Sequence, residues 1–296
     1  MNILVTGSNG FLGSNLCNLL NKNHNIYAVS RKFDKLDYDI TFIHSEMSDY
    51  LSLDKSIENI NVDCMIHCAW MGGNSSLDID KLWQTENIHY SSELLKLCSK
   101  HNISHFISLG SSAEYGYQES TFDETTICKP DSMYAITKNS FKSISENYCS
   151  RHNILHTWIR PVYTYGPNDV LTRLIPKTII SLLNNENLTL NKCSSIVDYL
   201  YVEDFAYAMK DIVEKKISGD YIICSDQEIR IKNVVELIYN KIKPNCSLFF
   251  DDTKEESKHS YVCGTSKKLK SLIDWSPKID FEEGIERTIH HYKKLV

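Results

Sequence analysis

The chain of 296 residues is 42% hydrophobic and 24% charged, which is enough apolar material for a stable globular protein of one large domain or slightly more. Its formal net charge is −6 and its Lys and Arg residues are scattered, so no basic field marks it as a nucleic-acid-binding protein. No stretch of about 18 uninterrupted apolar residues predicts a membrane span, so we expect neither nucleic acid nor membrane as a partner.

The chain begins "MNILVTG", which already reads as a strand with no signal-peptide pattern before it, so we expect a cytoplasmic protein. Further β-branched runs predict strands at residues 25–30, 41–44, 63–70, 105–111 and 155–161. Amphipathic stretches with apolar residues at three-and-four spacing lie between several of them and predict helices. This alternation predicts an α/β fold, a doubly wound parallel sheet with helices on both faces.

The turn after the first strand reads "TGSNGFLGSNL" and places Gly7, Gly10 and Gly13 three apart, where a helix begins. Glycine lets the backbone approach a pyrophosphate, and a helix N-terminus supplies free N–H groups and a positive dipole end. Three glycines also suit a flexible turn, but the strand before them and the helix after them favour a Rossmann-type dinucleotide site. The cofactor contacts expected in this turn are Gly7, Asn9, Gly10, Phe11, Leu12 and Gly13.

The end of the second strand, "AVSRK", indicates which nicotinamide cofactor is used. NAD-binding chains usually place an acidic residue here, whereas the 2′-phosphate of NADP needs cations. Ser30, Arg31 and Lys32 offer a hydroxyl and two cations, and no Asp follows before Asp34. We therefore predict NADP(H) as the cofactor, with NAD(H) as the alternative. A further alternative is that these residues form an ordinary solvated basic turn with no role in cofactor choice.

The ten cysteines form no Cys-x-x-Cys motif, and most lie in apolar segments such as "CMIHCAW" and "YIICS". We interpret them as buried reduced thiols. The 11 histidines are dispersed, with neither a His-x-x-x-His pair nor a nearby pair of carboxylates. We therefore expect no metal site.

Residues 132–140 read "SMYAITKNS" and place Tyr134 and Lys138 four apart, on one face of a predicted helix. A phenol titrates near pH 10 and an ammonium near 10.4, and a neighbouring positive charge favours the phenolate. We interpret Tyr134 as a group that exchanges protons near neutral pH with the help of Lys138. With 17 Tyr in the chain, the same spacing also arises by chance as an ordinary surface pair.

After residue 166 the alternation loosens, with strands predicted at residues 198–202 and 219–225 and a helical tail on both sides of a proline. We expect residues 1–165 to form an NADP-binding Rossmann domain that also takes strands near 196–225. Residues 166–296 are expected to form mainly a smaller, C-terminal substrate-binding lobe.

Taken in order, these segments resemble the extended short-chain dehydrogenase/reductase family, and within it the nucleotide-sugar epimerases, dehydratases and reductases. The resembling segments are "GSNGFLG" (7–13), "HCAW" (67–70), "GSSAEYG" (110–116), "YAITK" (134–138), "RPVYTYGPND" (160–169), "DYLYVEDFAYAM" (198–209) and "SKKLKSLIDWSPKIDFEEGIERT" (266–288). Beyond the glycine turn and the second strand, the resemblance implies cofactor contacts at Cys68, Ala69, Trp70, Asn87, Tyr134, Lys138 and Pro161.

The resemblance also implies catalytic roles. The tyrosine would be the proton donor or acceptor, the lysine would lower its pKa and bind the nicotinamide ribose, and Ser112 would hold the reacting oxygen. A nucleotide-diphosphate sugar would be the substrate, with contacts at Ser111, Ser112, Ala113, Tyr134, Asn168, Arg173 and Lys177. Val197 replaces an Arg that many members use for the diphosphate, so Arg173, Lys177 or Lys267 would have to take its place.

Departures from the family pattern narrow the expected chemistry. Family dehydratases carry an Asp-Glu pair where this chain has Ala113 and Glu114, and reductases that also epimerise carry a Cys and a His where it has Ala113 and Asn168. The resemblance then implies NADPH-dependent reduction of the C4 keto group of a nucleotide-linked, 4-keto-6-deoxy sugar for surface polysaccharide. The alternatives are an NAD(P)-dependent 4-epimerase and a non-catalytic cofactor-binding protein on the same fold.

Family members commonly form homodimers by packing two long helices from each subunit into a four-helix bundle. The equivalent segments here are residues 82–100 and 132–151. Leu94, Phe141 and Ile144 are the candidates for the outward apolar face, although each could face the sheet instead.

Overall fold

The computed structural model describes residues 1–37, 39–73, 78–255 and 259–296, which form two compact units. The first unit comprises Met1–Gly116, Thr126–Pro161 and Ala206–Ile222, and the second comprises Tyr117–Thr125, Val162–Phe205 and Ile223–Val296. Within the described ranges, no helix combines the length and the apolar character that crossing a bilayer requires.

The first unit is built on a seven-stranded sheet with strand order β10-β6-β5-β4-β1-β2-β3. Its strands are β1 (Asn2–Thr6), β2 (Asn25–Ser30), β3 (Thr41–His44), β4 (Cys64–His67), β5 (His105–Leu109), β6 (Leu155–Pro161) and β10 (Gly219–Ile223). The pairings from β3 through β6 are parallel, and the strand order reverses between β1 and β4. The predicted α/β Rossmann-type fold is confirmed, and the reversal is where such sheets bind ligands.

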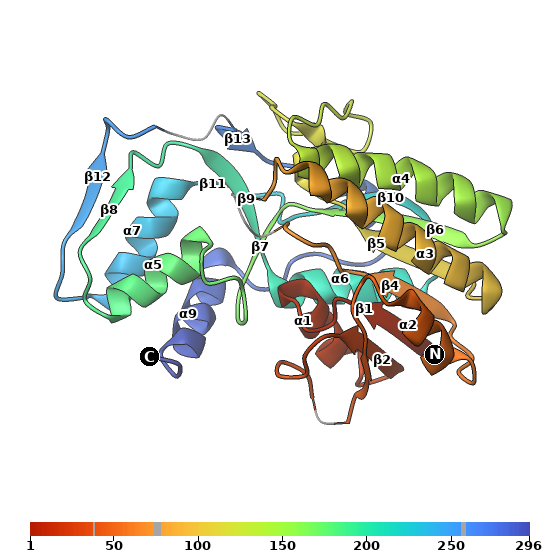
Figure 1. The fold of residues 1–296 in the computed structure, drawn as a ribbon. Coiled ribbons are helices and arrows are strands. Elements are labelled where there is room, and N and C mark those ends of the chain that lie inside the picture. Colours follow the sequence, from red (N-terminus) through yellow and green to blue (C-terminus); the bar gives the residue numbers. More distant parts are fainter. Residues whose placement is uncertain (38, 74–77, 256–258) are drawn as a thin grey trace. The chain divides into compact units, whose positions relative to one another are not determined.

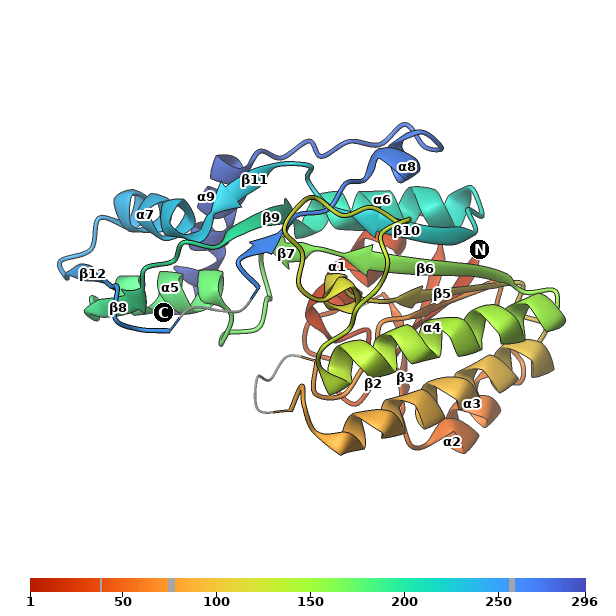
Figure 2. The same ribbon diagram turned by 90° about the horizontal axis from the view of Figure 1, so that it is seen from above.

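Helices cover both faces of this sheet. They are α1 (Phe11–Leu20), α2 (Tyr50–Ile57), η1 (Leu82–Thr85), α3 (Glu86–Lys100), η2 (Ser112–Tyr115), α4 (Met133–Arg151) and most of α6 (Val202–Glu214). Helices α3 and α4 run side by side over one face (Figure 1), and α1 lies on the other (Figure 2). The C-terminal ends of the strands and the turns that follow them are left open to form a site.

The buried faces of α3 and α4 correct one prediction. Leu94 is 7% exposed and Phe141 is fully buried, so both face the core and not outward, whereas Ile144 is 41% exposed. Phe141 lies at the centre of a ring cluster, with ring centroids 6.4 Å from Phe106 and 6.1 Å from Trp158. The four-helix dimer stays a prediction, with Ile144 as its exposed apolar residue among the three.

The second unit has two small sheets and its own helices. Strands β7 (Tyr163–Tyr165), β9 (Ile196–Tyr201), β11 (Glu228–Arg230) and β13 (Tyr261–Val262) form one sheet, and β8 (Leu188–Asn191) pairs with β12 (Leu248–Asp251). Helices α5 (Leu174–Leu183), α7 (Ile231–Ile242) and α9 (Phe281–Tyr292) share a buried core, and α8 (Lys267–Lys270) is short. Of the strands predicted near residues 196–225, β10 lies at the edge of the first sheet and β9 lies in this unit.

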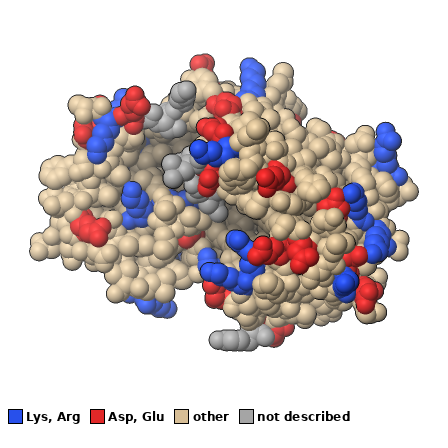
Figure 3. All heavy atoms as spheres, viewed as in Figure 1, with Lys and Arg blue, Asp and Glu red and all other residues tan. Residues whose placement is uncertain are grey.

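Charged side chains of both signs are interspersed over the surface drawn in Figure 3. Lys and Arg do not collect there into one basic surface. The distribution follows from a chain with 32 basic and 38 acidic residues spread along its length.

Candidate active site

The glycine turn between β1 and α1 is shaped by close backbone contacts. Gly7 has φ +69°, and a Cβ there would lie 2.6 Å from the Ala69 nitrogen. A Cβ at Gly13 would lie 2.3 Å from the Gly7 oxygen. In the described part of the chain, Ser8 Oγ is buried without a hydrogen-bond partner beside this helix N-terminus. A tight backbone cradle, a helix N-terminus and a spare hydroxyl fit a pyrophosphate.

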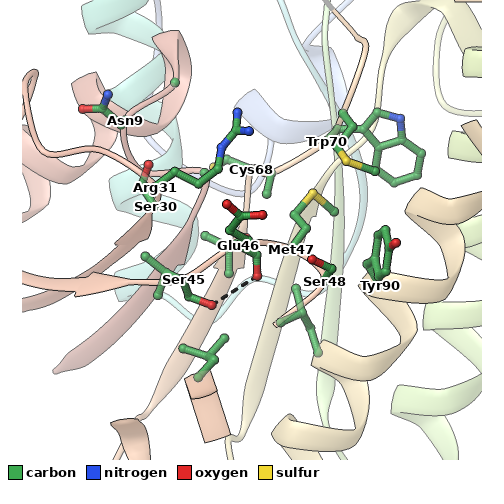
Figure 4. A pocket seen from close by; sticks show the side chains of 18 of the residues that line it. Asn9, Ser30, Arg31, Ser45, Glu46, Met47, Ser48, Cys68, Trp70 and Tyr90 are labelled. Carbon is green, nitrogen blue, oxygen red and sulfur yellow. Dashed lines mark hydrogen bonds between the residues drawn. The ribbon is translucent and has the colours of Figure 1, made fainter. Parts of the chain in front are cut away.

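A pocket of about 680 Å³ opens at the C-terminal ends of β1, β2 and β4, entirely within the first unit. The predicted cofactor residues that line it are Gly7, Asn9, Gly10, Ser30, Arg31, Lys32, Cys68, Ala69 and Trp70. The sequence interpretation missed the segment after β3, whose Ser45, Glu46, Met47 and Ser48 also line it (Figure 4), and Tyr90 of α3. The parallel register of β2 and β3 brings both strand ends to one edge, which could have indicated this segment.

Asn9 connects the glycine turn to the loop after β2. Its Oδ1 accepts from the backbone nitrogens of Asp34 (3.3 Å) and Lys35 (3.1 Å), and its Nδ2 donates to Asp34 Oδ1 at 2.5 Å. The carboxylate of Asp34 therefore accepts a hydrogen bond from Asn9. The charged groups at the end of β2 that line the pocket are Arg31 and Lys32, with Glu46 after β3.

The other predicted cofactor residues lie outside this lining. Phe11 and Gly13 are buried and Leu12 is half-buried in α1, and Pro161 is half-buried at the end of β6. Asn87 is buried in α3 and grips the backbone of Met71: its Oδ1 accepts from the Met71 nitrogen at 2.8 Å and its Nδ2 donates to the Met71 oxygen at 3.1 Å. Asn87 therefore shapes the loop after β4.

Tyr134 and Lys138 lie in the first turns of α4, as their spacing predicts. The helix starts there because Ser132 Oγ accepts from the Ala135 nitrogen at 3.2 Å. Tyr134 is half-buried, and Lys138 is only 3% exposed, with Nζ donating to the Leu109 oxygen at 2.6 Å. Nζ also lies 3.8 Å from the centroid of the Trp70 ring.

Burial lowers the pKa of the Lys138 ammonium to about 7. The ordinary value near 10.4 assumes full hydration, which this site denies to the charged form. Lys138 is therefore a group that titrates near neutral pH, and sequence spacing alone did not indicate this.

Lys138→Met should raise the melting temperature at pH 6. The folded-state pKa of Lys138 is about 7 and the unfolded value is near 10.4, so below pH 7 the folded protein carries the full cost of a buried charge. That cost shrinks as the pH rises from 7 towards 10.4, so the gain should be smaller at pH 9. At pH 6 the gain in stability from removing the buried charge should exceed the loss of stability from removing the hydrogen bond to Leu109.

Lys142→Met is the matched control, one turn further along α4. Lys142 Nζ lies 3.0 Å from both Glu146 and Asp220, and its pKa is raised. Its loss should therefore leave stability unchanged or lower it. Thermal unfolding followed by circular dichroism at both pH values measures the two variants, and a Lys138→Met protein less stable than wild type at pH 6 contradicts the argument.

The turn after β5 carries Ser111, Ser112 and Ala113. Ser111 Oγ accepts from the Ala113 nitrogen at 3.2 Å, while Glu114 Oε1 accepts from the Ser111 nitrogen at 2.7 Å, a capping box that starts η2. Ser112 is half-exposed, and its hydroxyl makes no hydrogen bond within the described part of the chain.

Glu114 is completely buried and is used by the protein itself. Its carboxylate lies 2.8 Å from Arg160 Nε, and Trp158 Nε1 donates to both of its oxygens at 3.2 Å. Burial opposes the charge of Arg160, yet Glu114 keeps the pKa of that guanidinium above its ordinary value. The turn fits tightly, because a Cβ at Gly110 would lie 2.3 Å from Trp158 Nε1. The sequence interpretation did not identify Arg160 as the partner of Glu114.

The remaining predicted substrate residues belong to the second unit. Asn168 has φ +66°, and Arg173 precedes α5 with Nη1 3.3 Å from Asp169 Oδ1. Lys177 is exposed on α5. Val197 is 2% exposed in β9, so an apolar residue there serves the core of the unit.

Comparison with known proteins gives the chain its family. The profile described as "NAD dependent epimerase/dehydratase family" matches residues 3–224. A dTDP-6-deoxy-L-talose 4-dehydrogenase (NAD(+)) of Aggregatibacter actinomycetemcomitans is 26% identical over 84% of this chain and 95% of its own length. A trifunctional UDP-glucose 4,6-dehydratase/UDP-4-keto-6-deoxy-D-glucose 3,5-epimerase/UDP-4-keto-L-rhamnose-reductase of Arabidopsis thaliana is 25% identical over 98% of this chain, which spans 47% of that relative.

Among solved structures, the UDP-glucose 4-epimerase of Thermotoga maritima with UDP-glucose superposes with a TM-score of 0.90. It covers 100% of this chain and 99% of its own at 21% identity, a likeness of fold. The family profile spans the glycine turn, the pocket, and the segments carrying Tyr134 and Lys138. The chain belongs to the NAD-dependent epimerase/dehydratase family.

Proposed function

We propose that the protein is an NADPH-dependent reductase of the C4 keto group of a nucleotide-linked sugar, of the 4-keto-6-deoxy kind, in the synthesis of surface polysaccharide. The observation that carries this proposal is the placing of Lys138. It is buried, titrates near neutral pH, and touches Trp70, which lines the nucleotide pocket. Tyr134 lies one helical turn before it, half-buried.

The residues present divide the reaction between them. When bound, the reduced nicotinamide supplies the hydride that reaches C4. Tyr134 gives its phenolic proton to the oxygen that becomes a hydroxyl, so that hydride and proton together convert the carbonyl to an alcohol. Ser112 donates a hydrogen bond to that oxygen, and Lys138 holds the ribose of the cofactor and supports the phenolate that Tyr134 leaves behind.

The hydrogen bonds and the ion pair that hold Glu114 favour reduction over dehydration as the reaction. A dehydratase needs acidic groups free to protonate and deprotonate neighbouring carbons, whereas Glu114 is locked between Arg160, Trp158 and its own turn. Ala113 beside it supplies no proton. Redox chemistry at one carbon is what the remaining groups support.

The substrate class is supported by relatives. One is named a 4-dehydrogenase of a dTDP-linked 6-deoxy sugar, and another includes a 4-keto-sugar reductase activity in its name. The diphosphate would be held in the second unit by Arg173, Lys177 or Lys267, since Val197 is buried.

The direct test is to incubate the purified protein with NADPH and a panel of 4-keto-sugar nucleotides, and separately with the corresponding 4-hydroxy-sugar nucleotides. A reductase consumes one NADPH for each hydroxyl formed. A 4-epimerase interconverts 4-hydroxy sugars without net loss of NADPH, and a non-catalytic binding protein does neither. Either of the last two results rejects the proposal.

Replacing Arg31 and Lys32 together with Gln should weaken NADPH binding far more than NADH binding. Both cations line the pocket, where the 2′-phosphate of NADPH would need them. Glu46 lines the same pocket, and its carboxylate would repel the 2′-phosphate. Without the two cations, the affinity for NADPH should therefore fall strongly.

The matched control replaces Lys22 and Lys55, two exposed lysines outside the pocket, with Gln. Fluorescence titration of all three proteins with NADPH and NADH measures the effect at constant ionic strength. An equal loss of affinity for both cofactors in the Arg31/Lys32 variant would show that these cations do not select NADPH.

A further inference from the structure

One face of α4 meets a single aromatic ring. Tyr134, Lys138 and Phe141 are spaced four and three apart, so they line one side of the helix. The Trp70 ring centroid lies 6.5 Å from that of Tyr134, edge to face, and 6.2 Å from that of Phe141. Between these two rings, Lys138 Nζ sits over the indole at 3.8 Å from its centroid. Trp70 therefore contacts two of the three residues to which we assign roles in the reaction, Tyr134 and Lys138.

Trp70 is held in this place from α3 and η1, independently of α4. Its Nε1 donates to Gln84 Oε1 at 3.1 Å, and Gln84 is completely buried. Gln84 is itself fixed, because its Nε2 donates to the Asp78 oxygen at 3.2 Å and its Oε1 accepts from Asn87 Nδ2 at 3.0 Å. A buried chain of amides thus fixes the plane of the indole.

Lys138 has few other partners for its charge. Of its three N–H donors, one goes to the Leu109 oxygen. Across residues 1–37, 39–73, 78–255 and 259–296, Lys138 forms no ion pair within 4.0 Å. Glu114 and, less strongly, Cys68 favour the charge through space, but the carboxylate of Glu114 is already paired with Arg160. His67 is the other titratable group nearby, and its imidazole stays neutral because burial and then Lys138 lower its pKa. The face of an aromatic ring attracts a cation, most strongly when water is excluded and the ring is Trp.

We propose that Trp70 is a positioning residue for Lys138: its indole face keeps the ε-ammonium charged and fixed at the C-terminal end of β5. The part of this proposal that concerns catalysis rests on the function proposed above, whereas the contact itself does not. Fixing one N–H on Leu109 and the ammonium on Trp70 leaves the remaining donors for a ribose. Trp70 thereby helps to set the pH, near neutrality, at which the lysine loses its proton.

A second explanation of the same contact is that Trp70 only fills space and excludes water. The two explanations predict opposite changes in the pKa of Lys138 when the ring is removed. If the ring face attracts the ammonium, removing the ring lowers the pKa of Lys138 further below its ordinary value. If the ring only excludes water, a smaller side chain admits water and raises the pKa of Lys138.

The experiment compares wild type, Trp70→Phe and Trp70→Leu, with Trp83→Leu as the matched control. Trp83 is the neighbouring tryptophan in η1 and does not line the pocket. Protein labelled with ¹³C at lysine Cε is titrated by NMR, and Lys138→Met identifies the Lys138 signal. This readout needs neither substrate nor turnover.

We expect the pKa of Lys138 to fall in the order wild type, Trp70→Phe, Trp70→Leu, by about one unit or more in the last. Trp83→Leu should leave it unchanged. Where wild type turns over, the alkaline limb of the rate should move to lower pH in the same order.

An unchanged or raised pKa of Lys138 in Trp70→Leu overturns the proposal. If that variant does not fold, Trp70→Phe decides alone, since its smaller ring attracts less and a raised or unchanged value contradicts the inference. Failure of the proposed function can be told apart from failure of this inference. In the first case the wild type reduces no keto sugar, but the order of the Lys138 pKa values measured by NMR still tests the contact with Trp70.

Discussion

Tyr134→Phe should reduce turnover by about 10²- to 10⁴-fold, the contribution that general acid catalysis makes. The substitution removes only a hydroxyl, so the ring keeps its edge-to-face contact with Trp70, 6.5 Å between centroids. Cofactor affinity should therefore stay close to wild type. Lys138→Met should impair both, because the same ammonium is assigned the ribose contact and the support of the phenolate.

Fluorescence titration and single-turnover reduction of both single variants and the double variant measure these effects. The combined loss of turnover should be smaller than the product of the single losses, because two residues that act as a unit are not lost twice. Near-normal turnover in a folded Tyr134→Phe protein would remove Tyr134 from the mechanism.

Acidification from pH 7 to pH 5 should lower the free energy of unfolding. Three buried histidines together contribute a loss of up to about 4 kcal/mol per pH unit, which Asp198 offsets in part below pH 6 because burial raises the pKa of its carboxyl to about 6. Three histidines of the first unit, His67, His105 and His156, have their pKa values lowered by burial to about 3, 4 and 4. Unfolded histidines titrate near 6.5, so below that pH the unfolded chain binds three protons that the folded chain refuses. The contribution of these three histidines to stability is full above pH 6.5 and is lost as the pH falls towards 4.

The packing explains why these histidines stay neutral. His67, Phe106, His156 and Trp158 form a row of stacked rings across β4, β5 and β6, with centroids 6.2 to 6.4 Å apart. His67 hydrogen-bonds the hydroxyls of Thr6 and Ser91, and His156 hydrogen-bonds that of Ser145. His105 hydrogen-bonds the Thr157 hydroxyl and the backbone of Ile217. A hydroxyl does not balance the charge of an imidazolium as a carboxylate would. Asp220 and Glu146 favour the charged form of His156, but its burial outweighs them.

Urea unfolding at intervals between pH 7 and 5 measures the slope. His105→Gln should reduce the slope of the free energy of unfolding against pH by the equivalent of about one proton, or about 1.4 kcal/mol per pH unit. His89→Gln, at an exposed position on α3, should leave the slope unchanged. A free energy of unfolding that is constant from pH 7 to 5 would show that the three rings are accessible to protons.

Local sequence patterns were enough for the fold and for part of the site. Alternating runs predicted β1 to β6, and the glycine spacing placed Gly7 and Gly10 in the pocket because both patterns are set within a few residues. The burial of Lys138 was not predicted, because Trp70 and Leu109 come from distant segments. Nothing in the spacing of Tyr134 and Lys138 indicates how dry their surroundings are.

The wrong expectations have the same physical origin. Leu94 and Phe141 were candidates for an outward face because α3 and α4 carry apolar residues on more than one side, and sequence alone does not tell which side meets the sheet. The partners of Glu114, Arg160 and Trp158, were not predicted for the same reason, because both come from β6.

The Glu114–Arg160 pair also limits how this site can evolve. Exchanging Ala113 for an acidic residue supplies one new carboxylate, but Glu114 stays tied to the guanidinium and the indole. Freeing it requires changing Arg160 as well, and that change alone leaves the buried carboxylate of Glu114 without its partner, at a cost of several kcal/mol. Converting this turn into one with two free carboxylates therefore passes through a destabilised protein.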